Sequence, residues 1–310
     1  MQERQHSPAW GSSYVPAIHA TPKEAPSVSH ASILHPAKLG GREMHLLSKP
    51  ERNLALLALH CSSVWDIHEQ RILAMDDSPH PLHGHAKAAG MHLDHLVGTI
   101  TIADRIGSLS RHGKVKYLDD ETEKWCWAAY PYVGDLLLFV DDAQGPFCLN
   151  WNVKDKANAF RKRLPRNGKP VGRQDEPQAI QRHELEAQHY QSGGIRTFQV
   201  AGEWLDFQVR CNLRELFLWH SRDAGVPRKV ELAALAIYRD AIGGLQTTSA
   251  LVSKVMQTQS VSREQAMILF KQGVWNRTIP WDLFTPLLMD QPLRAQTRDV
   301  FDVYGDWFRR

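Results

Sequence analysis

The clearest hydrophobic pattern in the chain lies between residues 135 and 153. Residues 136–140 are apolar without interruption, 141–146 contain turn-forming Asp, Gly and Pro, and 147–153 form a second, mostly apolar run. Apolar runs of this length, bounded by turn residues, are typical of strands buried on both faces. The pattern therefore predicts a hairpin at the centre of a sheet.

Shorter patterns around this hairpin predict the rest of an α/β domain. Ser48-Lys-Pro-Glu supplies a helix N-cap, and Leu54, Leu57 and Ala58 follow at helical spacing, which predicts a helix over 50–61. A second helix is expected over 176–191, whereas 121–130 favours neither structure. Alternating or short apolar segments predict strands at 64–70, 100–102, 114–117 and 195–200.

The two ends of the chain have different patterns. Residues 1–42 are rich in Pro, Ser, His and Ala without periodicity, which predicts an extended or partly disordered arm. Helical spacing returns at 230–242, 248–256 and 262–272, and the last segment opens with a Ser-Arg-Glu-Gln capping signature. We therefore expect an α/β domain with a mixed central sheet over 43–222, followed by a mainly helical, winged-helix-like domain over 223–310.

Composition narrows the class of protein. With 43% hydrophobic residues the chain can bury sizeable cores, and a net charge of +3 permits nucleic-acid binding without requiring it. None of the four cysteines forms a CxxC pair, which argues against a zinc ribbon or a disulfide framework. Since no apolar run is long enough to cross a bilayer and the N-terminus lacks the core of a signal peptide, we expect a soluble cytoplasmic protein.

Polar residues at the edges of the central hairpin suit phosphodiester hydrolysis. This reaction needs a divalent cation that lowers the pKa of the attacking water, with a positive group nearby. Mg²⁺ prefers oxygen ligands. Asp135 opens the first strand, and Asn152 and Lys154, two positions apart on the second, point to the same side of the sheet. The spacing predicts that these three side chains share one site.

Two further oxygen donors are candidates for the same site. Glu51, near the start of the helix over 50–61, can bind a metal directly or through water, and Val153 can present its backbone carbonyl. Lys154 is then expected beside the attacking water or the phosphate. The alternative is purely structural: Asp135 begins a strand, and Lys154 begins a solvated, charged turn, Lys154-Asp155-Lys156.

In the order of these residues the chain resembles the TnsA family, the endonuclease subunit of Tn7-like heteromeric transposases, within the PD-(D/E)xK nuclease superfamily. The resemblance covers roughly residues 42–290 and is carried by Ser48-Lys-Pro-Glu51, Val64 through Gln70, Gly134-Asp135-Leu-Leu-Leu-Phe-Val, Asn152-Val-Lys154, Tyr190 through Ile195, and Asn212-Leu213. It implies a restriction-endonuclease-like catalytic domain in which Glu51, Asp135 and Lys154 are catalytic. It also implies two Mg²⁺ ions, for which Mn²⁺ can substitute, with ligands from Glu51, Asp135, Asn152 and Val153.

The resemblance further implies a role in DNA transposition. Enzymes of this family hydrolyse the 5′-end strands of double-stranded DNA at transposon ends, while a TnsB-like DDE transposase cuts and joins the 3′ ends and a TnsC-like AAA+ ATPase is a further partner. Such a protein is bacterial and cytoplasmic, and it is associated with the nucleoid when active. Two residues depart from the usual pattern: Asn152 replaces an acid or glutamine and contributes no charge, and Gly134 replaces a proline that mainly fixes the entry into the strand.

Two other polar clusters each have a functional and a structural interpretation. A basic loop beyond the hairpin either grips DNA phosphates or is simply a solvated surface, and its charges are Arg161, Lys162, Arg163, Arg166, Lys169 and Arg173. A histidine-rich stretch suggests a metal site, but no cysteine and no recognised ligand spacing accompany it, which favours an ordinary polar loop. Its histidines are His80, His83, His85, His92 and His95.

The tryptophans of the first domain, Trp125, Trp127, Trp151 and Trp204, are expected mostly in the core or in an interface.

Two other functions remain open. One is a site-specific or restriction-type nuclease that works without transposase partners. The other is a catalytically inactive adaptor that recruits transposition proteins, an alternative that the uncharged Asn152 favours.

Overall fold

A computed structural model describes residues 2–5, 7–26, 30–119, 121–162 and 176–310. Contacts between Cα atoms divide the chain into two units. The first comprises Met1–Arg52, Ser63–Trp204 and Arg310, and the second comprises Asn53–Ser62 and Leu205–Arg309. This boundary at Trp204 and Leu205 lies earlier in the chain than the domain boundary predicted near residue 222.

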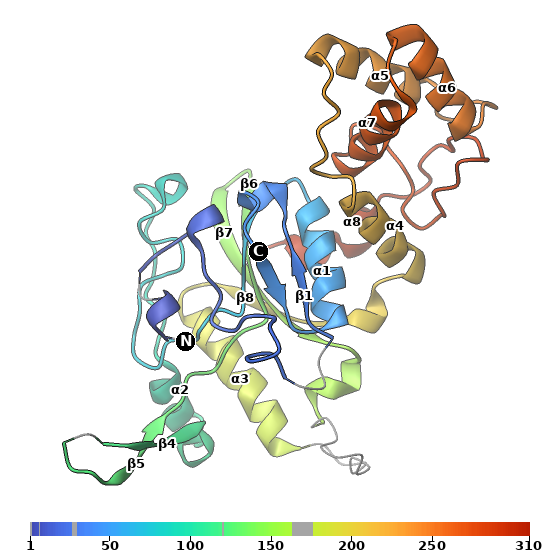
Figure 1. Cartoon of the computed structure of the whole chain (residues 1–310). Coiled ribbons are helices and arrows are strands. Elements are labelled where there is room, and N and C mark those ends of the chain that lie inside the picture. Colours follow the sequence, from blue (N-terminus) through green and yellow to red (C-terminus); the bar gives the residue numbers. More distant parts are fainter. Residues whose placement is uncertain (1, 6, 27–29, 120, 163–175) are drawn as a thin grey trace. The chain divides into compact units, whose positions relative to one another are not determined.

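The first unit is built on a four-stranded mixed sheet (Figure 1). Its strands are β3 (Val64–Glu69), β6 (Leu136–Asp142), β7 (Gly145–Lys154) and β8 (Arg196–Ala201), in the spatial order β3-β6-β7-β8. β6 runs antiparallel to both β3 and β7, whereas β7 and β8 are parallel. The prediction of an α/β unit with a mixed central sheet is confirmed at this level.

The predicted central hairpin is present. Residues 136–140 are all buried, which explains their uninterrupted apolar sequence in a strand with neighbours on both sides. The turn is tighter than predicted, because Asp142 pairs directly with Gly145 and only Ala143 and Gln144 connect the strands. Gly145 has φ of +103°, a conformation that side-chain-bearing residues rarely adopt.

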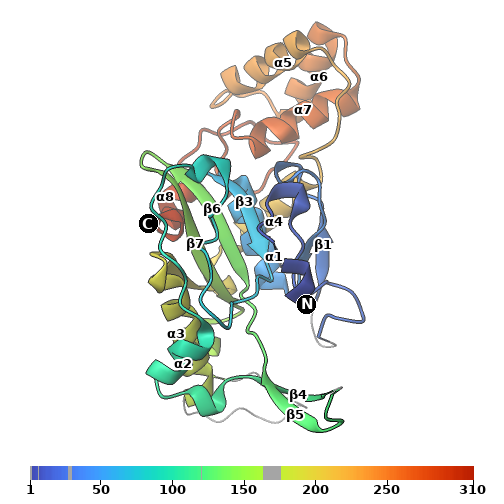
Figure 2. The same cartoon turned by 90° about the vertical axis from the view of Figure 1, so that its left-hand side faces the viewer.

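A helical connection links the two parallel strands, as parallel pairing requires. Helix α3 (Pro177–Ser192) begins with a proline in its first turn and buries His183, Leu185, Glu186 and Tyr190. Both views show α3 lying along the sheet (Figure 2). The helix predicted over 176–191 and the strand predicted over 195–200 are therefore confirmed.

The strand predicted at 100–102 is wrong. These residues belong to helix α2 (Thr99–Arg105), which buries Thr99, Ile102 and Ala103 at helical spacing. Ile102 and Ala103 pack in one cluster with Leu185 of α3. A short apolar run has no decisive periodicity of its own, so packing against α3 selects the helix.

A two-stranded sheet of the first unit extends away from its central sheet in both views. It consists of β4 (Lys114–Leu118) and β5 (Trp125–Ala129), which pair antiparallel as a hairpin. The strand predicted at 114–117 is confirmed, and the ambiguous segment 121–130 contains β5. Trp151 is fully buried in the core, whereas Trp125, Trp127 and Trp204 lie outside it with exposed fractions of 62%, 66% and 46%, so an interface position for these three stays a prediction.

The described part of the N-terminal segment packs onto the first unit. Strands β1 (Ser32–Leu34) and β2 (Met44–Leu46) pair with each other, and single-turn 3₁₀ helices precede them. The Tyr14 hydroxyl donates to the Glu69 carbonyl at 2.7 Å, and its ring stacks on His68 with centroids 3.8 Å apart. Much of the region predicted as an arm is therefore anchored beside β3.

The second unit is mainly helical. Besides residues 53–60 of α1 (Lys49–His60), it contains α4 (Phe207–Phe217), α5 (Arg228–Asp240), α6 (Thr248–Gln259), α7 (Arg263–Trp275) and α8 (Val300–Tyr304). The predicted capping box is present, because Ser262 and Gln265 bond reciprocally at the start of α7. Within residues 205–309, all of which are described, no strand forms, so a mainly helical C-terminal unit is confirmed and its winged-helix character stays a prediction. No helix in the described ranges is long and apolar enough to cross a membrane.

Candidate active site

The start of β6 and the end of β7 lie side by side, because the strands are antiparallel and Leu136 pairs with Trp151. Asp135 immediately precedes β6, and residues 152–154 close β7. The backbone N–H of Val153 donates to Asp135 Oδ2 at 2.6 Å. The spacing argument thus placed the aspartate and the end of the second strand correctly next to each other.

The ammonium group of Lys154 lies where three oxygen atoms converge. It donates to the Val153 carbonyl at 2.8 Å, to Asn152 Oδ1 at 3.2 Å and to Asp135 Oδ2 at 3.3 Å. The side chains of Lys154 and Asp135 keep exposed fractions of 26% and 20%, so solvent reaches the group. Three of the four predicted metal ligands therefore surround one positive charge at the edge of the sheet.

Contacts from α3 fix the orientation of the Asn152 amide. Its Nδ2 donates to His183 Nδ1 and to Glu186 Oε2, each at 2.8 Å. The other carboxylate oxygen of Glu186 accepts from Asn150 Nδ2 at 2.9 Å. Because both amide hydrogens are used in this way, the amide oxygen of Asn152 is left facing Lys154.

Burial controls the charge of these two α3 residues. Burial, together with the nearby positive charges of Lys154 and Arg182, lowers the pKa of His183 to about 4. The imidazole is therefore neutral near pH 7, and its Nδ1 can accept the Asn152 hydrogen. Burial, together with the charge of Asp135, raises the pKa of Glu186.

Glu51 lies in the first turn of α1, where the N-cap positions it. Ser48 Oγ accepts from the Glu51 backbone N–H at 3.2 Å and donates to Glu51 Oε1 at 2.8 Å. Oε2 accepts from the Leu47 backbone at 2.9 Å and from Gln70 Nε2 at 3.0 Å. The Ser-Lys-Pro-Glu sequence thus holds this carboxylate in one place.

The carboxylate of Glu51 is in an unfavourable environment for a negative charge. Burial, followed by the negative charge of Asp135, raises its pKa to about 7, against the opposing effects of the Leu47 and Ser48 hydrogen bonds and of Lys154. Gln70, which donates to Glu51 Oε2 through its side chain and to the Asp135 carbonyl through its backbone, joins the two residues. A bound cation would relieve both the repulsion and the cost of burying the charge.

Gln70 connects this carboxylate to the sheet. It follows β3 with φ of +50°, which costs about 1 kcal/mol for a residue other than glycine. Its backbone N–H donates to the Asp135 carbonyl at 3.2 Å while its side chain reaches Glu51. Strained conformations of this type are concentrated at functional sites.

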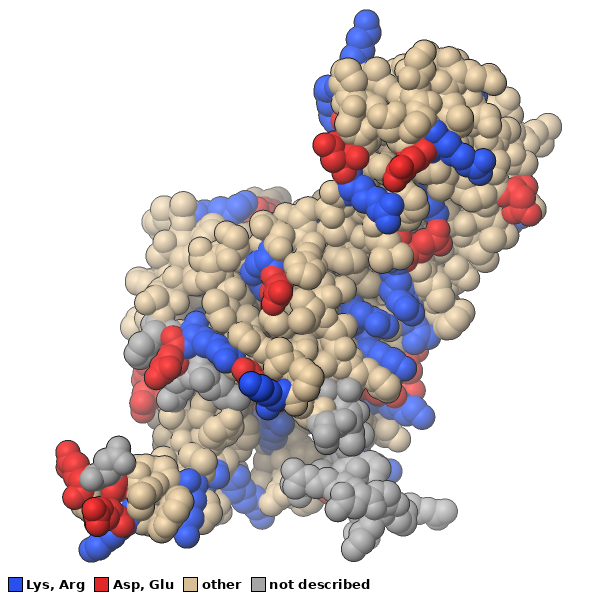
Figure 3. Space-filling model, in the orientation of Figure 1, with Lys and Arg blue, Asp and Glu red and all other residues tan. Residues whose placement is uncertain are grey.

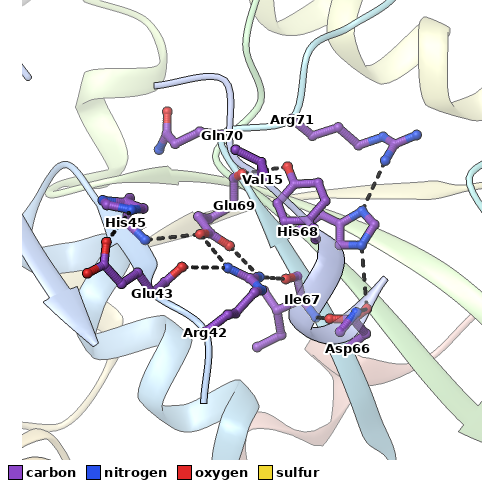
Figure 4. A network of polar contacts seen from close by, with 12 residues as sticks. Val15, Arg42, Glu43, His45, Asp66, Ile67, His68, Glu69, Gln70 and Arg71 are labelled. Carbon is purple, nitrogen blue, oxygen red and sulfur yellow. Dashed lines mark hydrogen bonds and ion pairs between the residues drawn. The ribbon is translucent and has the colours of Figure 1, made fainter. Parts of the chain in front are cut away.

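A buried ion pair supports the strand just before Gln70 (Figure 4). Arg42 donates through both terminal nitrogens to the two oxygens of Glu69, each at 2.8 Å, and also to the Ile67 carbonyl at 2.6 Å. The His45 backbone donates to Glu69 Oε1 at 3.0 Å. Both charged side chains are almost fully buried, so the end of β3 is fixed by paired charges.

The residues present fit a hard divalent cation. Among the described residues there is no group of three or more His, Cys, Asp or Glu side chains that could hold a metal. The oxygens around Lys154 are instead the Asp135 carboxylate, the Asn152 amide and the Val153 carbonyl, and Glu51, joined to Asp135 through Gln70, adds a second carboxylate. Mg²⁺ accepts such mixed oxygen ligands and retains several waters.

Sequence reasoning did not identify His183 and Gln70 as site residues, and it did not separate Glu186 from the exposed Glu184 on the same helix. The available signal was the i, i+3 spacing of His183 and Glu186, which places both on one face of α3. Nothing in the sequence indicated that this face meets Asn152.

The structure describes one of the other two predicted clusters in full and the other only in part. Of the basic loop, Arg161 and Lys162 are described, and Arg163, Arg166, Lys169 and Arg173 lie outside the described residues. In the histidine-rich stretch, His80 is buried, which lowers its pKa to about 4, and its Nδ1 accepts from the Leu82 backbone at 3.0 Å. His92 is exposed and contacts Asp94 at 3.2 Å.

No family model matches the chain, and no curated protein matches it.

Proposed function

We propose that this protein is a Mg²⁺-dependent DNA endonuclease of the TnsA type, with its active site at the ends of β6 and β7. The observation that carries the proposal is the convergence of Asp135 Oδ2, Asn152 Oδ1 and the Val153 carbonyl on Lys154 Nζ, with the buried Glu51 carboxylate nearby. A mixed sheet with an acid and a lysine on its central hairpin supports a restriction-endonuclease-like domain.

In this proposal each side chain has a definite role. Glu51 and Asp135 would hold the cation together with the Asn152 and Val153 oxygens. Bound Mg²⁺ supplies positive charge that acidifies a water and neutralises the phosphate. The Asp135, Asn152 and Val153 oxygens that now contact Lys154 would serve as ligands of the cation, and the Lys154 ammonium would stabilise the developing charge on the scissile phosphate. His183 and Glu186 keep the Asn152 oxygen aimed at the cation.

The test is strand cleavage of transposon-end DNA with Mg²⁺ by the full-length protein together with its transposase partner. We expect Asp135→Ala to abolish cleavage and to leave folding intact, because Asp135 is partly exposed and precedes the strand. Asp141→Asn is the matched control, since Asp141 lies at the other end of β6 and pairs with Lys87 at the surface. Retained cleavage by Asp135→Ala would remove the basis of the proposal.

We also propose that cleavage takes place at transposon ends together with a TnsB-like transposase and a TnsC-like ATPase. The order of the sequence segments that resemble the TnsA family supports this setting, as do the packed helices α5, α6 and α7 for the C-terminal domain. Cleavage by the purified protein alone would favour a restriction-type nuclease instead. Absence of Mg²⁺ binding in calorimetry would favour the adaptor.

A further inference from the structure

The β4–β5 hairpin has two different faces. Directly paired residues of an antiparallel ladder share a face. Lys114, Lys116 and Leu118 pair with Ala129, Trp127 and Trp125, whereas Val115 and Tyr117 pair with Ala128 and Cys126. We call the surface formed by Lys114, Lys116, Leu118, Trp125 and Trp127 the Lys/Trp face. It combines positive charge with the two most exposed tryptophans of the unit.

The Lys/Trp face is not covered by the described part of the chain. Trp125 and Trp127 have exposed fractions of 62% and 66%, and all five residues of β4 are exposed. Lys116 Nζ lies 5.3 Å from the centre of the Trp125 ring, which confirms that they share a face. An isolated two-stranded hairpin is marginally stable in water, and exposed tryptophans add no stability, so this surface suits a partner.

The distribution of charged residues along the hairpin limits where a charged partner can bind. Lys114 and Lys116 lie in the half of β4 nearer the body of the unit, whereas Asp119, Glu121 and Glu123 lie in the turn. The turn also holds one lysine, Lys124, so its described charges remain acidic on balance, and Figure 3 shows mostly acidic residues at the tip and further basic residues closer to the body. A polyanion would therefore contact the strands rather than the tip.

The hairpin is also close to the candidate active site along the chain. Only residues 130–134 separate the end of β5 from Asp135. Even a fully extended chain of this length spans at most about 20 Å. On DNA that distance corresponds to about six base pairs. The base of the hairpin is thus within reach of DNA that lies in the proposed site.

We propose that the Lys/Trp face binds the duplex DNA that flanks the cleaved bond. Lys114 and Lys116 neutralise phosphates, while Trp125 and Trp127 pack against sugars and base edges in a groove, which a two-stranded ribbon can enter. This inference rests on the proposed function, because it takes DNA as the substrate.

The test measures binding of the full-length protein to a short fluorescein-labelled DNA duplex in EDTA, where metal-dependent cleavage is suppressed. We expect Trp125→Ala/Trp127→Ala to weaken binding at least about fivefold. Lys114→Ala/Lys116→Ala is expected to lower the slope of log Kd against log salt by about 1.8, since each lost phosphate contact contributes about 0.9. Val115→Ala/Tyr117→Ala is the matched control, because it removes exposed apolar area from the opposite face of the same strands.

The outcomes separate this inference from the proposed nuclease. If wild-type protein cleaves DNA with Mg²⁺ but the Lys/Trp variants bind as tightly as the control, the inference is overturned and the nuclease stands. If binding depends on the Lys/Trp face but wild-type protein never cleaves DNA with Mg²⁺, even together with a transposase partner, the inference stands and the nuclease is wrong. If the Lys/Trp variants bind DNA as tightly as wild-type protein but fail to cleave it in the presence of a transposase partner, the face contacts that protein. This result would overturn the inference.

Discussion

Replacing Glu51 by glutamine should make the metal-free protein more stable at alkaline pH. In the folded protein, burial and the charge of Asp135 raise the pKa of Glu51 to about 7, from an ordinary value of 4.5. A carboxyl with a raised pKa destabilises the fold once it ionises, because the folded state holds the proton more tightly than the unfolded state. Glu51 therefore leaves the free energy of unfolding unchanged at pH values below its pKa in the unfolded chain. The free energy of unfolding decreases as the pH rises from 4.5 towards 7, and it is lowest above that range.

The size of the effect follows from the same shift. A difference of about 2.5 pKa units corresponds to about 3 kcal/mol at alkaline pH. Glutamine has nearly the same shape, and its oxygen can still accept from the Leu47 backbone or Gln70. We thus expect Glu51→Gln to gain up to about 3 kcal/mol of unfolding free energy at about pH 8 and almost none at about pH 4.

The assay is urea denaturation in EDTA at both pH values, with Glu43→Gln as the matched control because Glu43 is exposed. Saturating Mg²⁺ should then stabilise the wild type at alkaline pH but not Glu51→Gln, because only the ionised carboxylate gains from the cation. If Glu51→Gln is no more stable than wild type at alkaline pH, then Glu51 does not carry a buried, repelled charge, and the electrostatic argument for the cation site is wrong.

Three further predictions concern the same region. Mg²⁺ affinity measured by calorimetry should increase as the pH rises through about 7, with proton release on binding, because the pKa of Glu51 is about 7 and a protonated carboxyl is a poor ligand; a pH-independent affinity would contradict this. Glu186→Gln should lower Mg²⁺ affinity about 10- to 100-fold by disturbing the Asn152 amide, whereas Glu184→Gln, on the exposed face of α3, should leave it unchanged. Arg42→Met should cost about 3–5 kcal/mol of unfolding free energy, because it leaves the Glu69 carboxylate buried without its partner, and a loss below about 1 kcal/mol in urea denaturation would show that Glu69 is neutral in the fold.

Local sequence was sufficient for the elements whose pattern is long and regular. The β6–β7 hairpin follows from two apolar runs around a turn, and α3 follows from a periodic segment with a proline in its first turn. Because antiparallel strands bring the start of one beside the end of the next, the hairpin alone predicted the proximity of Asp135 and Lys154.

The remaining features depend on contacts that a single segment does not reveal. Residues 99–105 form a helix because they pack against α3, although the apolar run within them is equally compatible with a strand. The direction of the Asn152 amide depends on two α3 side chains that are distant in sequence. The positive φ of Gln70 likewise arises where β3 ends beside Asp135, and its own sequence context gives no sign of it.

The buried pair of Arg42 and Glu69 also constrains how this sequence can change over evolution. Losing either partner leaves an isolated charge inside the protein, whereas replacing both with apolar side chains of similar volume can be nearly neutral. We therefore expect selection to remove single substitutions at these two positions and to retain joint substitutions. In an alignment of homologous chains, the two positions should covary, and that covariation would record the contact between the N-terminal segment and the central sheet.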